Sequence, residues 1–255
     1  MDALTVTERR NKIIEMLNEK GKINVNDLSA LFSVSKVVIR TDLTELEHQG
    51  MLTRVHGGAI TSYKSYNNMS LVQRSNTNAR EKMAIAKKID ELIKDNSTIM
   101  MNAGTTPIFI LRKIADKKVT IVTNSIALAL EGAKNPNFKI VLLGGEVDST
   151  YQFTYGSHTL KSLGNYSADV LILAVDGIDS ENGISTYYHQ EVEICREMIN
   201  RSAHSIVAAD YSKIGRLSFA KIDNVSGIDT LVTNKDSDEE SLSKLNAKGI
   251  KIIRA

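Results

Sequence analysis

Several short segments carry glycine or small polar side chains in the pattern of an anion-binding loop. Two of them directly follow apolar runs: Gly104-Thr105-Thr106 and Thr123-Asn124. Pro107 fits the first turn of a helix, so we expect Thr106 to cap a helix whose free N–H groups face the loop. Backbone amides and hydroxyls in this arrangement bind phosphate, and the sequence therefore predicts a phosphate site.

Two further segments would add to this site. The pair Gly144-Gly145 closes another apolar run and would let the backbone approach a bound molecule with no Cβ in the way. Lys213 follows the apolar run 205–209 and would supply a positive charge. Each of these loops alone is ordinary turn chemistry, and Lys213 alone could be a solvated surface residue. Their occurrence together favours a binding site.

A different set of side chains, within the first 60 residues, is suited to contacts with nucleic acid. Ser35 is the expected N-cap of a helix on which Ile39, Leu43 and Leu46 share one face. The opposite face and the exposed first turn carry groups that can reach phosphates, guanine and thymine methyls in a major groove. These residues are Lys36, Val37, Arg40, Thr41 and Thr44.

The segment after this helix is typical of a wing, with a strand, a Gly57-Gly58 turn and a returning strand. Its Arg54 and His56 would reach the DNA backbone or the minor groove beside the reading helix. The alternative is a module for protein contact whose charged face is only solvated. The first 60 residues hold eight Lys or Arg and eight Asp or Glu, so net charge does not decide between the two.

Start and stop signals place two shorter helices before the reading helix. Thr7 is the expected N-cap of the first, which ends at Gly21, and Asn26 is the expected N-cap of the second. The second helix should carry three side chains inward: Leu28, Leu31 and Phe32. Residues 61–78 are rich in Ser, Asn and Thr and predict a linker or a poorly ordered arm. The expected domains are thus a winged helix-turn-helix over residues 1–60 and a larger domain over residues 79–255.

Beyond residue 79, apolar runs of β type alternate with helical patterns. The runs are TIMM, VTIVT, KIVLL, DVLILAV, SIVAA, TLVT and IKII. They predict an α/β fold with a mainly parallel sheet covered on both faces. Ligands of such sheets bind outside the carboxyl ends of the strands, where the predicted phosphate-binding segments should converge.

Composition excludes several classes of protein. A chain of 255 residues with 42% hydrophobic residues can bury one substantial core and a small satellite domain. No run approaches the roughly 20 apolar residues of a membrane span, and a signal peptide is not evident, so we expect a cytoplasmic protein with no membrane partner. Cys195 is the only cysteine and the histidines are scattered, which predicts no disulfide and no metal site.

The stretches VSKVVIRTDLTELEHQG and MLTRVHGGAI resemble the signature of the DeoR family of bacterial regulators. Val-Ser, Ile-Arg, Asp-Leu and Val-His-Gly-Gly-Ala recur there at these spacings, and MNAGTT, VTNS, LLGGE, VDGID and AADYSK extend the resemblance over nearly the whole chain. It implies a repressor that binds double-stranded operator DNA as a homodimer or homotetramer and is relieved by a phosphorylated metabolite. The chain departs from the pattern at Val38, usually Thr, and at Thr41, usually a second Arg, so the operator sequence does not transfer.

The resemblance also implies a fold shared with ribose-5-phosphate isomerase and glucosamine-6-phosphate deaminase, in which the loop like Gly104–Thr106 holds the phosphate. A sugar-phosphate isomerase or deaminase fused to a DNA-binding domain is therefore the rival, with Asp176 and Glu191 or Glu193 as acid and base. However, Asn102 stands where many of these regulators have Asp, and no well-specified acid-base pair is present. We expect no catalytic residues, and expect Asp176 and Glu191 to hydrogen-bond sugar hydroxyls. As alternatives, Asp176 is an ordinary turn residue and Glu191 belongs to an exposed helix start.

The sequence as a whole predicts a repressor of a carbohydrate-utilisation operon whose second domain binds a phosphorylated sugar and needs no further cofactor. A DNA-binding scaffold without a sensor is a third interpretation. Four tyrosines would line a lid over the ligand or only patch the surface: Tyr151, Tyr155, Tyr187 and Tyr188.

Overall fold

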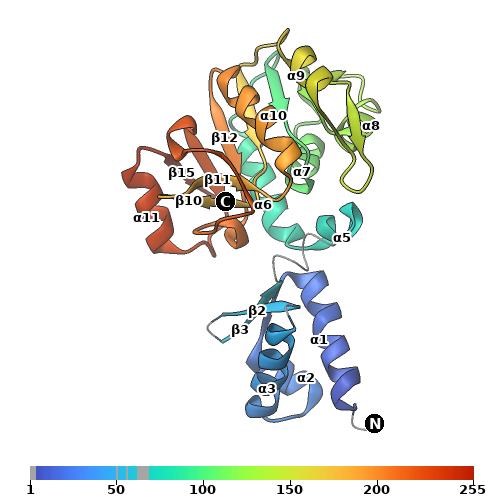
Figure 1. Cartoon of the computed structure of the whole chain (residues 1–255), viewed down its shortest axis with the longest axis vertical. Helices are drawn as coiled ribbons and strands as arrows, with labels where there is room; N and C mark the ends of the chain where they lie inside the picture. The colour runs from blue at the N-terminus through green and yellow to red at the C-terminus, as the bar shows by residue number, and fades with distance from the viewer. Residues whose placement is uncertain (1–3, 50, 56, 62–68) are drawn as a thin grey trace. The chain divides into compact units, whose positions relative to one another are not determined.

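The computed structural model describes residues 4–49, 51–55, 57–61 and 69–255 (Figure 1). His56, one of the expected wing residues, lies outside the described residues. The chain divides into two compact units, an N-terminal unit (Met1–Ala79) and a C-terminal unit (Arg80–Ala255).

The N-terminal unit packs three helices against a three-stranded antiparallel sheet of order β1-β3-β2. Its elements are α1 (Val6–Lys20), β1 (Lys22–Asn24), α2 (Val25–Phe32), α3 (Lys36–His48), β2 (Leu52–Val55) and β3 (Gly58–Thr61). Their apolar faces form one core, which includes Ile13, Leu17, Leu28, Ile39, Leu43 and Leu52. Helices α2 and α3 followed by the β2–β3 hairpin form the predicted winged helix-turn-helix.

Side chains cap the helices of this unit, although two caps differ from the prediction. Helix α1 begins after Thr5, not Thr7, because Thr5 and Glu8 form a reciprocal capping box. Helix α2 begins after Asn24, whose side chain accepts a hydrogen bond from the backbone N–H of Asn26. Two boundaries lie where they were predicted: Gly21 after α1 and Ser35 before α3.

The inward face of α2 also differs from the prediction. Leu28 is buried, whereas Leu31 is 58% exposed and Phe32 is half-buried. At 100° per residue the buried stripe runs through Val25, Leu28 and Phe32, and Leu31 lies beyond its edge. The prediction for Leu31 is therefore wrong, because the helix starts earlier than expected and its stripe is centred closer to Val25.

The segment predicted as a linker contains a helix. Helix α5 (Leu71–Asn76) begins at Ser70, which forms a capping box with Gln73, and it packs against α1. The Thr77 hydroxyl donates to the carbonyl of Asn18 at 2.8 Å. The prediction of an irregular stretch up to residue 78 is wrong for this part, because a Ser-x-x-Gln start signal lies within its polar composition. Residues 62–68 lie outside the described residues.

The C-terminal unit is built on a seven-stranded sheet in which every strand pair is parallel. The strands are β4 (Thr98–Met101), β5 (Val119–Thr123), β6 (Phe138–Leu142), β9 (Val170–Leu173), β12 (Ser205–Ala208), β14 (Thr230–Thr233) and β15 (Lys251–Arg254). They coincide with the seven apolar runs of the sequence, which confirms the predicted α/β fold class. Their spatial order is β15-β14-β12-β9-β4-β5-β6.

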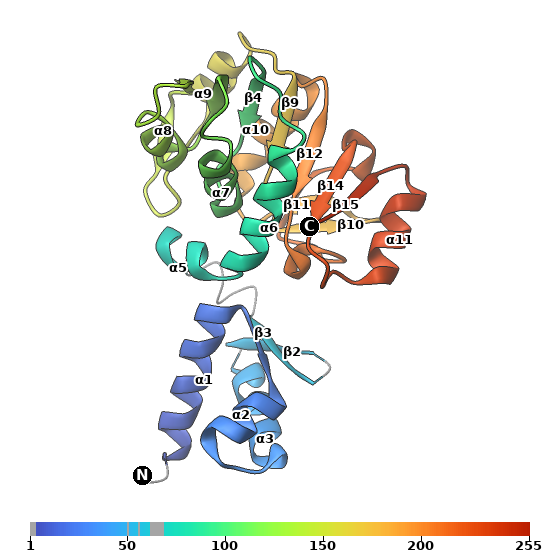
Figure 2. The ribbon, with the colours of Figure 1, turned by 180° about the vertical axis from the view of Figure 1, so that it is seen from behind.

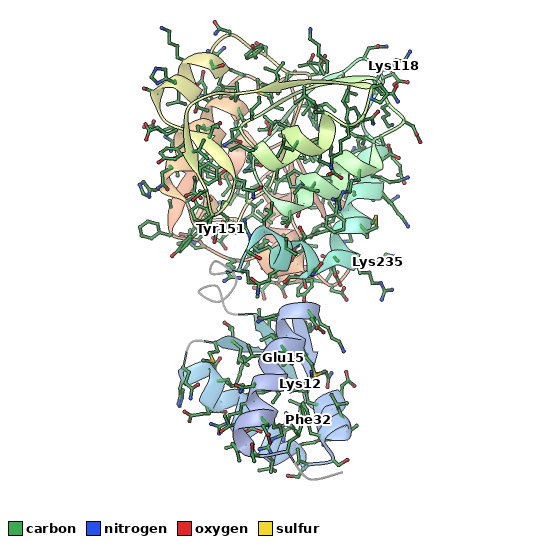
Figure 3. All side chains as sticks on the ribbon, turned by 90° about the vertical axis from the view of Figure 1, so that its right-hand side faces the viewer. Lys12, Glu15, Phe32, Lys118, Tyr151 and Lys235 are labelled. Atoms are coloured by element: carbon green, nitrogen blue, oxygen red, sulfur yellow. The ribbon has the colours of Figure 1, made fainter. Side chains whose placement is uncertain are left out.

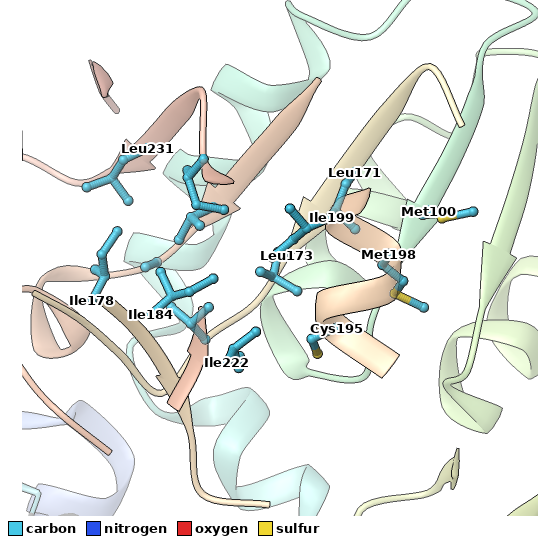
Figure 4. Close-up of a cluster of buried hydrophobic side chains, with 14 of the residues drawn as sticks. Met100, Leu171, Leu173, Ile178, Ile184, Cys195, Met198, Ile199, Ile222 and Leu231 are labelled. Carbon is cyan, nitrogen blue, oxygen red and sulfur yellow. The ribbon is translucent and has the colours of Figure 1, made fainter. Parts of the chain in front are cut away.

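Helices cover both faces of this sheet. Helices α6 (Ala79–Asp90) and α7 (Thr105–Lys113) lie on the face turned to the viewer in Figure 2, and α9 (Ser157–Leu163) and α10 (His189–Asn200) lie on the face turned to the viewer in Figure 1. Helix α8 (Ile126–Gly132) packs against α7, and α11 (Glu239–Ala247) packs against β15. Figure 4 shows the core between the sheet and α10, to which Leu171, Leu173, Cys195, Met198 and Ile199 contribute.

Shorter elements decorate the carboxyl ends of the large sheet. They are the hairpin β7 (Glu146–Asp148) and β8 (Phe153–Tyr155), the antiparallel sheet of β10 (Gly177–Asp179), β11 (Gly183–Thr186) and β13 (Ala220–Asp223), and the 3-10 turn η1 (Tyr211–Lys213). A second 3-10 turn, η2 (Val225–Gly227), precedes β14. Strands of three or four residues show no sustained alternation, so the sequence pattern did not predict them. Across the described ranges no helix is long and apolar enough to cross a membrane.

Candidate functional site

Helix α3 buries one side and exposes the other, as its sequence predicts. Ile39, Leu43 and Leu46 are buried in the core of the N-terminal unit. The outer side carries the predicted DNA-contacting residues, of which Lys36, Val37, Arg40 and Thr41 are exposed and Thr44 is half-buried. The Ser35 side chain accepts a hydrogen bond from the N–H of Val38 at 3.3 Å and fixes the start of the helix. A capped helix with a polar outer side, next to a wing, can enter a major groove.

One stripe of this outer side faces the wing. Arg40, Thr44 and Glu47 are spaced i, i+4 and i+7 along α3. The Arg54 side chain donates from Nη1 to Thr44 Oγ1 at 2.8 Å, and the Arg54 backbone N–H donates to Glu47 Oε1 at 2.7 Å. The wing residue Arg54 is thus held against α3 rather than projecting freely. The other exposed positions of this side are Lys36, Val37 and Thr41.

Two arginines of α1 form ion pairs with the buried side of α3, the reading helix. Asp42 of α3 is 2% exposed and accepts hydrogen bonds from Arg9 Nε at 2.6 Å and from Arg10 Nε at 2.9 Å. A buried carboxylate costs free energy unless it is paired, and two guanidinium groups pair it fully. This contact fixes the rotation of α3 about its axis, and with it the residues presented to DNA.

The large sheet of the C-terminal unit reverses its direction of growth between β4 and β9. Strands β5 and β6 extend it on one side, and β12, β14 and β15 extend it on the other. At such a switch point the flanking loops turn to opposite faces and leave a crevice in which ligands bind. Asn102 bridges this point: its Nδ2 donates to the carbonyl of Ala174 at 2.9 Å, and its Oδ1 accepts from the N–H of Ala174 at 2.8 Å.

The loop after β4 leaves the N-terminus of α7 open to an anion. Gly104 rather than Thr106 is the N-cap, because Thr105 and Thr106 already belong to the first turn, and no side chain among the described residues caps the helix. A Cβ at Gly104 would lie 2.9 Å from the Cβ of Ala174, so only glycine lets this loop pass so close to β9. The first N–H groups of α7 are therefore left for a ligand.

The loops after β9 and β12 bring an acid and a cation together. Asp176 Oδ1 lies 3.7 Å from Lys213 Nζ, and the two side chains are only 16% and 7% exposed. Asp176 Oδ2 accepts a hydrogen bond from the backbone N–H of Tyr187 at 3.0 Å. Glu191, in the first turn of α10, is 5% exposed. Neither Lys213 nor Glu191 is a solvated surface group, which was the alternative that the sequence left open.

Thr123 and Asn124 lie one strand further along the same edge, because Thr123 pairs with Met101 of β4. Both are fully buried. Asn124 Nδ2 donates to the carbonyl of Thr154 at 3.2 Å, and its Oδ1 has no hydrogen-bond partner in the part of the chain that the structure describes. Ser125 caps α8. This loop therefore borders the switch point and carries a buried acceptor that a ligand donor would satisfy.

Gly144 and Gly145 border the Thr123–Asn124 loop, since the N–H of Leu143 donates to the carbonyl of Thr123 at 2.8 Å. They follow β6, the edge strand, two strands away from β4, and both are exposed. The Thr159 hydroxyl donates to the carbonyl of Gly144 at 2.9 Å, which ties the loop to α9. The predicted loops after β4, β5, β9 and β12 thus lie along one edge of the sheet, and the glycine pair follows β6 at the end of that row.

The four predicted lid tyrosines form one aromatic cluster with Phe153. The ring centroids of Tyr151 and Tyr188 are 4.0 Å apart, those of Tyr187 and Tyr188 are 5.1 Å apart, and Phe153 lies 6.0 Å from Tyr155 and from Tyr188. Figure 3 shows Tyr151 at the end of the C-terminal unit opposite to Lys118, which directly precedes β5. The cluster therefore lies at the carboxyl ends of the strands, next to Asp176 through Tyr187.

Two family profiles match the two units. Residues 9–64 match the DeoR-like helix-turn-helix domain, and residues 77–235 match the DeoR C terminal sensor domain. The chain belongs to the DeoR family. The profile of the sensor domain covers the Asn102, Asp176 and Lys213 loops, and the helix-turn-helix profile covers α3 and the wing.

Curated relatives of this DeoR-family chain are named as transcriptional repressors. A protein of Escherichia coli O157:H7 with the provisional name aga operon transcriptional repressor is 35% identical over 97% of this chain and 93% of its own length. The glycerol-3-phosphate regulon repressor of Escherichia coli K12 is 34% identical over 89% of this chain and 90% of its own length. Among solved structures, ribose 5-phosphate isomerase A from Methanocaldococcus jannaschii is 16% identical, with a TM-score of 0.41 over 55% of each chain.

Family membership assigns a role to each unit. The N-terminal unit is a DNA-binding domain and the C-terminal unit is a sensor domain, so the chain is a transcriptional repressor rather than an enzyme fused to a DNA-binding domain. This outcome agrees with the expectation drawn from the sequence.

Asn102 stands where the family resemblance leads us to expect Asp in many regulators, and its geometry explains the amide. It is 2% exposed and uses one donor and one acceptor on the same residue, Ala174, with a further contact of 3.6 Å from Nδ2 to Cys195 Sγ. An ionised carboxylate could accept from Ala174 but not donate to it. Burial, followed by the negative charge of Glu191, holds the pKa of Cys195 well above its ordinary value. The thiol is therefore an inert core group beneath the switch point.

Lys82 is a buried cation that the sequence reasoning missed. It is 1% exposed, in the first turn of α6. The signal was present, because Lys82 occupies the same helical stripe as Ile85, Ala86 and Ile89, all of which are buried. Burial and the nearby carboxylates of Asp210 and Glu81 raise the pKa of Tyr211, which places this turn of α6 near η1.

Proposed function

We propose that this DeoR-family repressor binds a phosphorylated sugar at the switch point of its sensor domain and releases a carbohydrate-utilisation operon when it does so. The observation that carries the proposal is that the loops after β4, β9 and β12 meet there. They bring together the uncapped start of α7 at Gly104, the Asn102–Ala174 bridge and the buried Asp176–Lys213 pair. An uncapped helix N-terminus next to a buried ammonium group suits a phosphate.

The remaining groups of the site are acceptors, which suits a polyol. Asp176, Glu191 and the Oδ1 of Asn124 can accept hydrogen bonds from sugar hydroxyls. The phosphate would lie at Thr105 and Thr106 with Lys213, and the hydroxyls would lie towards the carboxylates. No cofactor beyond this effector is part of the proposal. The name of the glycerol-3-phosphate relative supports the same chemical class, a small phosphorylated polyol.

Regulation of this kind requires at least two copies of the chain and two arrangements of their sensor domains. We propose that the chain acts as a homodimer or homotetramer in the cytoplasm, so that two copies of α3 read a repeated or palindromic operator. The effector must bind one arrangement of the sensor domains more tightly than the other, because equal affinity would shift nothing. Size-exclusion chromatography with light scattering, with and without operator DNA, measures the number of copies.

A thermal-shift screen of the full chain tests effector binding. Phosphorylated sugars are compared with the same sugars without phosphate, and an effector at about a hundred times its Kd should raise the melting temperature of the sensor domain by roughly 5 to 10 °C. Lys213→Met should abolish this rise. Lys235→Met is the matched control, because Lys235 is an exposed cation at the same end of the sheet (Figure 3).

Two results would contradict the proposal: silence across the whole panel of phosphorylated sugars, or an equal rise with the sugar that lacks phosphate. A rise that survives in the Lys213→Met protein would move the phosphate away from this site.

A further inference from the structure

A cleft between the reading helix and the wing holds two guanidinium groups. It has a volume of about 290 Å³ and is lined by Val25, Arg40, Leu43, Arg54, Val55, Gly57 and Gly58. Arg40 and Arg54 are its charged lining residues within the described ranges, and both are exposed. Positive charge that faces solvent favours an anion in a hollow where no acid is among the described lining residues.

The donors in this cleft are largely unused. Arg40 has no side-chain hydrogen bond or ion pair to any of the described residues. Towards the described residues, the Arg54 side chain uses only Nη1, which donates to Thr44 Oγ1 at 2.8 Å. A guanidinium group carries five N–H donors in a planar fork that matches a phosphate. The two side chains therefore have donors to spare for an oxyanion.

The walls of the cleft are fixed by hydrogen bonds. The Arg54 backbone N–H donates to Glu47 Oε1 at 2.7 Å, and the N–H of Val25 donates to the carbonyl of Gly57 at 2.9 Å. The first bond ties the wing strand to α3, and the second ties the wing turn to the start of α2. A site that is already formed before its ligand arrives loses little entropy on binding.

The hydroxyl groups of α3 are committed to partners within the unit. Thr44 Oγ1 donates to the carbonyl of Arg40 at 2.9 Å while it accepts from Arg54. Thr41 Oγ1 donates to the carbonyl of Val37 at 3.1 Å. Thr44 has little left to offer a base, whereas Thr41 keeps its methyl group and its acceptor lone pairs on the stripe that it shares with Val37.

We propose that Arg40 and Arg54 together clamp one backbone phosphate of the operator in the cleft between α3 and the wing, and that the bases are read by Val37 and Thr41 on the neighbouring stripe of α3. This inference rests on the proposed operator binding. It assigns phosphate binding to one stripe of α3 and base recognition to another. The clamp sets the position of the helix on the duplex and carries no sequence information of its own. Arg40 is thus a positioning residue rather than a base reader.

The test uses the full-length protein and two duplexes. A duplex selected from a randomised library by the native chain is compared with a scrambled duplex of the same composition, and Kd is measured for both over a series of KCl concentrations. Arg40→Met and Arg54→Met should each weaken binding to both duplexes by the same factor. Val37→Ala and Thr41→Val should change the ratio between the two duplexes. Lys139→Met removes one exposed positive charge from the other unit and should change neither quantity.

The double variant shows whether one phosphate is shared. Each neutralised phosphate contributes about 0.9 to the slope of log K against log salt. If Arg40 and Arg54 hold the same phosphate, the double variant should lose about 0.9, whereas two separate phosphates would give a loss of about 1.8. Melting temperatures of the variants check that the fold is intact. Where a methionine variant fails this check, Arg40→Gln or Arg54→Gln takes its place.

Three outcomes would overturn the clamp while operator binding stands. They are a changed base preference in Arg40→Met, a loss of about 1.8 in the slope, or unchanged DNA affinity in both single variants, which would leave the cleft to a free phosphate ion. A native chain without salt-dependent binding to any duplex would overturn the proposed function as well, so the two failures are distinguishable.

Discussion

Asn102 is the residue on which the sensor site depends most directly. It joins the ends of the two strands that flank the switch point, and only an amide side chain supplies both the donor and the acceptor that Ala174 requires. The bridge holds the loop of Gly104 against the loop of Asp176. Without it, the phosphate-binding and hydroxyl-binding halves of the proposed site would have no fixed separation.

Asn102→Asp should therefore destabilise the C-terminal unit. The substitution places a buried acceptor opposite the carbonyl of Ala174 and removes its donor, which costs about 1–3 kcal/mol of unfolding free energy. Urea denaturation of the full chain measures the change. Asn200→Asp, at an exposed position at the end of α10, is the matched control and should lie within about 0.5 kcal/mol of the native chain. Equal stability of the two variants would show that the bridge contributes nothing.

Single residues differed in how far the sequence could predict them. Gly104, Thr123 and Lys213 follow buried strands, so their place at the carboxyl edge could be inferred from pattern alone. The Asn102–Ala174 bridge could not, because its partners are 72 residues apart in the chain. The position of Lys82 on the apolar stripe of its helix predicts burial. However, a lysine on such a stripe often extends its charged end to solvent, so the pattern alone did not decide.

The wing is the element whose geometry is most sensitive to a single atom. A Cβ at Gly58 would lie 1.9 Å from the carbonyl oxygen of Ile23 in the neighbouring strand β1, whereas a Cβ at Gly57 would meet nothing within 4 Å. Gly57 has a φ of 77°, so there an added side chain costs only local backbone strain.

Gly58→Ala should consequently weaken DNA binding more than Gly57→Ala. The first must push β3 away from β1 and open the cleft of Arg40 and Arg54, and the second only strains the turn by about 1 kcal/mol. Melting of the N-terminal unit and Kd for the selected duplex measure both effects. The same loss for the two variants, or a larger loss for Gly57→Ala, would argue against a fixed wing.

Elements were predictable where one signal dominated. The seven strands of the large sheet are buried on both faces and appear as continuous apolar runs, so all seven were found. Helix α5 was missed because its Ser70–Gln73 capping box lies in a stretch whose composition is typical of a linker. The boundaries of α1 and α2 were two residues late, since Thr and Asn recur close together there and only the hydrogen bonds select Thr5 and Asn24.

At the scale of the whole molecule, the two units carry separable chemistry. The first 60 residues are neutral in composition but present positive charge at α3 and the wing, and the C-terminal unit carries the proposed anion site at the switch point of its sheet. Neither property alone makes a regulator. Regulation follows only if an effector at the switch point changes the affinity of α3 for DNA, which is a coupling free energy between two sites.

The most direct measurement is the release of DNA by the effector. The full chain is bound to a fluorescent duplex selected from the randomised library, and the phosphorylated sugar found in the thermal screen is titrated while anisotropy is followed. We predict that the native chain and Lys235→Met release the duplex at the same effector concentration, whereas Lys213→Met holds it throughout. Release from Lys213→Met at the native concentration, or release by the sugar without its phosphate, would contradict the account.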